Sequence, residues 1–163
     1  MSERRGFTLI ELLVVIAIIG ILSAVVLASL NAARLKGNDA AIQANLSTIQ
    51  TQAEVYYGNH NNSYGTRAYL VFGAGVDPAG VRCAGTGAAE HIFKDQTIQK
   101  ALNAADAANG AGNIGCSANG QSYIVAVALT APSPDAYWCV DSSGRAKQVT
   151  GTISAPLPAL CPN

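Results

Sequence analysis

The chain has 163 residues, ten basic and ten acidic side chains, and four cysteines. A chain of this length suits one small globular domain beside an anchoring segment, rather than two full domains. The balanced charge argues against a general nucleic-acid-binding surface, which normally carries an excess of basic residues.

The apolar segment at residues 7–30 is the most distinctive feature of the chain. It holds sixteen Leu, Ile, Val and Phe residues, and Glu11 is its only ionisable side chain. As a helix it would be about 36 Å long, which is enough to cross a hydrocarbon core of about 30 Å. A cleavable secretory signal has a shorter apolar core of roughly 7–15 residues. An uncleaved single-span anchor explains the length and the preceding Arg4 and Arg5, but not the carboxylate.

The residues that open this segment resemble the leader junction of type IV pilins and pseudopilins, in which a short basic leader ends in Gly before a Phe and a Glu. Here these positions are Gly6, Phe7 and Glu11. The resemblance implies that a prepilin peptidase cuts between Gly6 and Phe7 and N-methylates the new Phe7 amine. It also implies that Glu11 pairs with the Phe7 amine of a neighbouring subunit, because a charged group in lipid needs a partner. The alternative is a carboxylate that is merely tolerated near the membrane interface.

The family resemblance also implies the fold class. We expect an α+β type IV pilin fold, with one long N-terminal helix packed under a small antiparallel sheet of three to four strands. The expected divisions are a cytoplasmic leader at 1–6, a transmembrane and filament-core helix at 7–30, its amphipathic continuation at 31–58, and a globular head with an αβ-loop at 59–163.

Periodicity supports the continuation of the helix into the head. One apolar stripe recurs at spacings of three and four, which is one face of a helix; its members are Ile42, Leu46, Ile49, Ala53 and Tyr56. The segment 58–65 is rich in Gly and Asn, which adopt left-handed conformations readily and therefore predict the end of this helix.

The rest of the head is predicted to contain one further helix and a group of strands. The pattern predicts a second helix at 91–108, with Ile98, Leu102 and Ala105 on its apolar face. Strands are predicted at 69–72, at 122–129, and in a hairpin of 137–141 with 146–149, from their β-branched and aromatic residues. In the strand at 122–129, alternate positions carry bulky side chains, and we expect that face to cover the long helix.

All four cysteines, Cys83, Cys116, Cys139 and Cys161, lie in the part of the chain expected to be exported. An even number of cysteines in a small exported domain predicts two disulfides, for which three connectivities are possible. We favour Cys83–Cys116 and Cys139–Cys161, since the second would tie the C-terminal tail to the preceding strand, as in many pilins. Four free thiols in a reducing compartment are the alternative.

The sequence carries no motif that indicates an enzyme, a cofactor or a metal site. His60 and His91 are isolated, and neither a phosphate-binding loop nor a nucleophile elbow is present. Asp135, Asp141 and Ser143 could join a calcium site of the kind some pseudopilins carry. Calcium takes about 6–8 oxygen ligands, which this spacing does not specify, so we expect a solvated turn.

These observations predict a structural subunit of a type IV pilus that polymerises through its N-terminal helix. A pseudopilin of a type II secretion system is the first alternative, and a monomeric membrane-anchored binding module is the second. The expected partners are membrane lipid before assembly, the prepilin peptidase, an assembly platform in the inner membrane, and other copies of the chain. The expected location is the inner membrane, with a cytoplasmic N-terminus, and then an extracellular pilus.

Overall fold

The computed structural model describes residues 7–72, 83, 90–110, 114–130, 136–151 and 160–162. The chain divides into two compact units, Met1–Leu35 and Lys36–Asn163, which we call the N-terminal unit and the head. The helix α1, Leu9–Asn59, contributes residues to both units.

The head portion of α1 forms the floor of the hydrophobic core. The buried residues of this helix are those of the predicted stripe: Ile42, Leu46, Ile49, Ala53 and Tyr56. Each fully buried side chain of Ile or Leu size contributes about 1.5–3 kcal/mol to stability. The chain leaves the helix through Asn61 and Asn62, both in the left-handed region with φ of 54°, as the Asn-rich sequence predicts.

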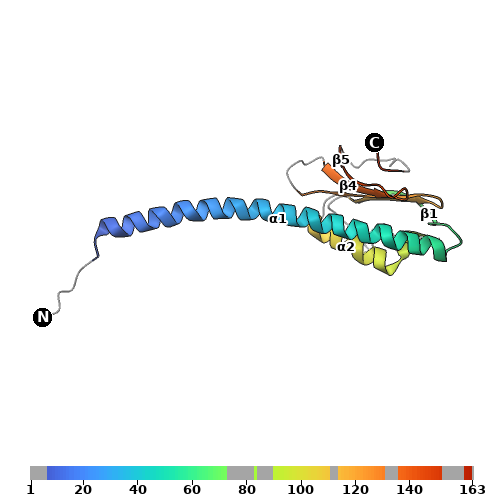
Figure 1. Cartoon of the computed structure of the whole chain (residues 1–163), viewed down its shortest axis with the longest axis horizontal. Helices are drawn as coiled ribbons and strands as arrows, with labels where there is room; N and C mark the ends of the chain where they lie inside the picture. The colour runs from blue at the N-terminus through green and yellow to red at the C-terminus, as the bar shows by residue number, and fades with distance from the viewer. Residues whose placement is uncertain are drawn as a thin grey trace. The chain divides into compact units, whose positions relative to one another are not determined.

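A five-stranded antiparallel sheet packs on one side of this part of α1 (Figure 1). The strands lie in sequence order and comprise β1 (Thr66–Phe72), β2 (Ile114–Asn119), β3 (Tyr123–Ala128), β4 (Ala136–Asp141) and β5 (Ala146–Thr150). The α+β architecture is therefore as expected, but the sheet has more strands than the predicted three to four. The strand β2 was not predicted from the sequence, because its small and polar residues such as Gly115 and Ser117 give no β-propensity signal.

The two faces of β3 belong to two different layers of the head. Tyr123, Val125 and Val127 lie in the same core cluster as the buried residues of α1, which confirms that the bulky face covers the helix. Ile124 and Ala126 are also buried, in a smaller cluster on the opposite face of the sheet that includes the C-terminal Cys161. The central strand is therefore covered on both faces.

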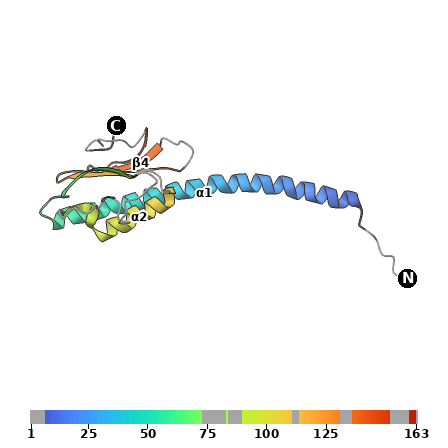
Figure 2. The ribbon, with the colours of Figure 1, turned by 180° about the vertical axis from the view of Figure 1, so that it is seen from behind.

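The second helix of the head runs alongside α1 and also contacts β3 (Figures 1 and 2). It begins with a 3-10 turn, η1 (Ile92–Lys94), followed by α2 (Gln96–Asn109). Asp95 separates the two as the N-cap of α2, and its side chain accepts hydrogen bonds from the backbone N–H groups of Thr97 and Ile98. The predicted helix at 91–108 thus starts later than expected, because Asp95 satisfies the helix N-terminus.

A close backbone approach joins the start of β1 to the start of η1. Gly65 forms an isolated bridge with His91, and its φ is +71°. A Cβ atom at this position would overlap the carbonyl oxygen of Glu90 and the Cα of His91. Glycine is therefore required here both by its backbone conformation and by the space.

Candidate functional site

The first turn of α1 is closed by a reciprocal pair of side chains. The Oε2 atom of Glu11 accepts hydrogen bonds from the backbone N–H of Thr8 at 2.9 Å and from its hydroxyl at 2.6 Å. In return, the backbone N–H of Glu11 donates to the Thr8 hydroxyl at 3.3 Å. This arrangement is a capping box, in which a Thr N-cap and a Glu three residues later satisfy each other's N–H groups.

The cap fixes one oxygen of the carboxylate and leaves the other available. Both hydrogen bonds that the Glu11 carboxylate accepts involve Oε2, so Oε1 has no partner among the residues that the structure describes. Glu11 can therefore cap its own helix and accept a further hydrogen bond or ion pair at the same time. Glu11 was predicted from the sequence to be functional, but the capping role of Thr8 was not, although the Thr-x-x-Glu spacing is typical of a capping box.

The apolar side chains of residues 7–30 are exposed along the whole segment. Each of its sixteen Leu, Ile, Val and Phe residues is at least 47% exposed, and Phe7 reaches 80%. By length and composition, α1 contains a stretch able to cross a membrane. Soluble monomers rarely expose a contiguous apolar surface of this extent, which marks a surface for membrane or protein contact.

The predicted processing site is only partly described. Phe7 lies just before α1 and is strongly exposed, one residue from the cap formed by Thr8. Gly6, the other residue of the expected cleavage site, lies outside the described residues. The structure thus places the Phe7 backbone at the open end of the helix that carries Glu11.

The four cysteines form the two disulfides that the sequence analysis favoured. Cys83 is bonded to Cys116 in β2, and Cys139 in β4 is bonded to Cys161 near the C-terminus. The Cα atoms are 6.1 Å and 5.9 Å apart, which is within the usual range for disulfides. Both bonds therefore link a strand of the sheet to a segment distant in sequence.

Asp141 is the last residue of β4, beside the turn that leads to β5, and only 1% of its surface is exposed. One carboxylate oxygen, Oδ1, accepts from the backbone N–H and hydroxyl of Ser143 at 2.8 and 2.6 Å and from the N–H of Arg145 at 3.3 Å. The other, Oδ2, accepts from the N–H of Cys161 at 2.7 Å. Burial raises the pKa of Asp141, but the hydrogen bonds from Ser143, Cys161 and Arg145 outweigh it and hold the pKa below its ordinary value.

These contacts give Asp141 a role other than metal binding. Both of its oxygens serve N–H and O–H donors within the head. Among the described residues, no three His, Cys, Asp or Glu side chains are grouped so that they could hold a metal ion. Asp135, the other acidic residue of the calcium site considered from the sequence, lies outside the described residues.

Residues 1–27 match the family model described as the prokaryotic N-terminal methylation motif. The chain therefore carries a prokaryotic N-terminal methylation motif. The matched residues include most of the exposed apolar segment at residues 7–30 and the capped Glu11.

A curated relative extends the likeness beyond the motif. The chain is 43% identical over 82 residues to the type IV wide pilus major component PilA4 of Thermus thermophilus. The match covers 50% of this chain and spans 63% of the length of that relative. No solved structure matches the chain.

Proposed function

We propose that this pilin-like chain is a structural subunit of a type IV pilus, which polymerises through its N-terminal helix. The observation that carries the proposal is the exposed apolar surface of residues 7–30, which coincides with the methylation motif. Such a surface is stable in lipid or against identical helices, and a filament core supplies the second environment. The likeness to a pilus major component supports a pilus over the other functions considered.

Maturation is proposed to generate the group with which Glu11 pairs. A prepilin peptidase would cut between Gly6 and Phe7 and methylate the Phe7 amine, which retains a positive charge. The free Oε1 of Glu11 would then accept an ion pair from the Phe7 amine of an adjacent subunit, while Oε2 keeps the helix cap. Since Phe7 has no free amine before cleavage, an uncut chain could not form this pair.

The proposal includes a path from the membrane to the filament. Before assembly the apolar segment would span the inner membrane, with its leader in the cytoplasm, in contact with lipid and an assembly platform. Each subunit would leave the bilayer as its helix packs against those of earlier subunits. The head would then lie outside the cell, where an oxidising environment suits its two disulfides.

Two substitutions separate the charge of Glu11 from its capping role. Glu11→Gln removes the charge but keeps a side chain that can complete a capping box, whereas Thr8→Val keeps the charge and removes the cap hydroxyl. We expect Glu11→Gln to insert into the membrane but to give few pili by electron microscopy, and Thr8→Val to give substantially more. Wild-type pilus numbers in Glu11→Gln would contradict the proposed pairing. Cells that express the wild-type chain but contain it in no filament would contradict the proposed function itself.

A further inference from the structure

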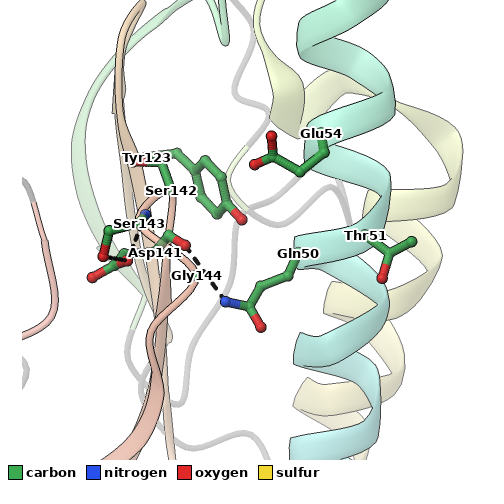
Figure 3. A pocket seen from close by; sticks show the side chains of 8 residues that line it. All are labelled: Gln50, Thr51, Glu54, Tyr123, Asp141, Ser142, Ser143 and Gly144. Atoms are coloured by element: carbon green, nitrogen blue, oxygen red, sulfur yellow. Dashed lines mark hydrogen bonds between the residues drawn. The ribbon is translucent and has the colours of Figure 1, made fainter.

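A polar cleft opens in the head between α1 and the turn that joins β4 to β5. It has a volume of about 430 Å³, and Figure 3 shows Gln50 and Glu54 of α1 facing the turn across it. The ring of Tyr123 forms one wall, and its hydroxyl points into the space between Gln50 and Glu54. A space of this size can accept one long side chain with a few water molecules. This cleft was not predicted from the sequence, and the function proposed above does not depend on it.

The hydrogen-bond donors of the turn are already used inside the head. The backbone N–H of Ser142 donates to the carbonyl of Tyr123, and that of Gly144 donates to the carbonyl of Asp141, both at 3.2 Å. The N–H of Ser143 donates to the carboxylate of Asp141. An anion in the cleft would therefore meet no free N–H group from this turn, which argues against a phosphate or carboxylate ligand.

The other polar groups that line the cleft are mostly hydrogen-bond acceptors. Oε1 of Glu54 accepts a hydrogen bond from the hydroxyl of Tyr64 at 2.8 Å, which orients the carboxylate and leaves Oε2 without a partner in the described part of the chain. The amide nitrogen of Gln50 donates to the carbonyl of Arg145 at 2.9 Å, so its oxygen is the end left for a ligand. No Lys or Arg side chain is among the described residues that line the cleft. The Glu54 carboxylate, with neutral oxygens and no positive charge beside it, therefore favours a ligand that is a positively charged hydrogen-bond donor.

An organic cation suits this cleft better than a metal ion. Ca²⁺ takes about 6–8 oxygen ligands, commonly with several carboxylates. Of the carboxylates that line the cleft in the described part of the chain, Glu54 alone is not occupied by hydrogen bonds from the turn. A lysine ammonium has three N–H donors, and the carboxylate oxygen of Glu54 that Tyr64 does not occupy can accept one of them as an ion pair.

We propose that this cleft receives a lysine side chain from a second copy of the chain. The side chains of three lysines of the head form no hydrogen bond or ion pair with the described residues; they are Lys36, Lys100 and Lys147. Lys100 is exposed on α2, and Figures 1 and 2 show that helix on the other side of α1 from the sheet. A contact between two different patches is heterologous and can repeat without closing, as a filament requires. The inference rests on the proposed function, because filament assembly is what brings the heads together.

Carbodiimide cross-linking tests the contact directly, since it joins a carboxylate and a lysine amine that touch. Cells are shifted from ¹⁴N to ¹⁵N medium during growth so that their filaments contain both kinds of subunit, and cross-linked peptides are then identified by mass spectrometry. We expect a Glu54–lysine peptide that pairs one light and one heavy chain, with Lys100 as the first candidate for the lysine.

Two variants control the experiment. Glu54→Gln should lose this cross-link but keep its melting temperature, because a Gln side chain can still accept from Tyr64. Glu90→Gln changes a carboxylate outside the cleft, which is 74% exposed, and should leave the cross-link unchanged. An exposed pair of this kind is expected to alter each contact's association constant by at most about fivefold, with less effect at high salt.

The outcomes distinguish this inference from the function on which it rests. Wild-type filaments that give no Glu54 cross-link between light and heavy chains would overturn the inference and leave the pilus function intact. A wild-type chain that forms no filaments would overturn the proposed function and, with it, this contact.

Discussion

Replacing Asp141 by Asn tests whether this buried carboxylate holds the C-terminal segment on the sheet. Asn has nearly the same shape, and its oxygen can still accept from Ser143 and Arg145. Its amide nitrogen, however, would then face the N–H of Cys161, so a hydrogen bond of 2.7 Å becomes a contact between two donors. The amide cannot escape by turning over, because its nitrogen would then face the N–H groups of Ser143 and Arg145.

The size of the effect follows from the burial of the group. A hydrogen bond to a charged acceptor contributes about 1.5–3 kcal/mol, and a buried donor left without a partner costs about 1–3 kcal/mol. We therefore expect Asp141→Asn to lower the free energy of unfolding by about 2–4 kcal/mol. The disulfide of Cys161 should keep the tail attached, so the loss should appear as a lower melting temperature rather than as an unfolded head.

The pH dependence gives an independent readout of the same residue. Because the folded-state pKa of Asp141 is depressed, its contribution is present above the unfolded-state pKa of about 4 and is lost as the pH falls through the folded value. The melting temperature of the detergent-solubilised full chain should fall on acidification below about pH 4, and less steeply in Asp141→Asn than in the wild type. Glu90→Gln, at an exposed position, is the matched control. An Asp141→Asn protein with wild-type stability at neutral pH and an unchanged acid transition would refute this account of the turn.

Three further tests probe other parts of the structure; the first two each compare a substitution with a control substitution, by thermal or denaturant unfolding of the full chain. Gly65→Ala should cost more than about 2 kcal/mol, since it combines a positive φ with overlap of the Glu90 backbone. Gly110→Ala, where φ is +70° but the space is open, should cost only about 1 kcal/mol; equal losses at the two sites would show that the close approach at Gly65 is unimportant. Leu46→Ala removes a fully buried side chain from the face of α1 under the sheet and should cost about 2–5 kcal/mol, whereas Val55→Ala, half-exposed on the same helix, should cost far less. Thr8→Val should weaken the first turn of α1 by about 1 kcal/mol, seen as faster amide hydrogen exchange there, and unchanged exchange would contradict the capping role.

The parts of the fold that could be predicted from the sequence are those governed by local patterns. The stripe from Ile42 to Tyr56 follows from helical periodicity alone, and the hairpin of β4 and β5 follows from two β-rich runs around a short polar turn. The bulky face of β3 could be assigned because side chains alternate along a strand. In each case the information lies within roughly fifteen residues of the chain.

The parts that could not be predicted depend on contacts between distant segments. The carboxylate of Asp141 binds Cys161, far along the chain, and Gln50 of α1 binds the carbonyl of Arg145. Nothing local identifies these partners. Cysteine spacing likewise leaves three connectivities open. The strand β2 escaped detection for a related reason, since its small residues are stabilised by pairing with β1 and β3 rather than by their own propensity.

At the N-terminus, sequence and structure are complementary. The motif identified Glu11 as unusual, because a carboxylate interrupts an apolar segment. The structure adds that Thr8 holds one of its oxygens and that the other has no partner in the described part of the chain. The Glu11 side chain is therefore held in place through one oxygen and can accept a further hydrogen bond at the other.

Mass spectrometry of the N-terminus of the chain, purified from sheared surface filaments, is the decisive test of cleavage before Phe7 and assembly into a filament. We expect a protein that begins at Phe7 with an N-methylated amine and retains both disulfides. A chain recovered from cells that still begins at Met1, with an unmodified N-terminus and no presence in filaments, would contradict it.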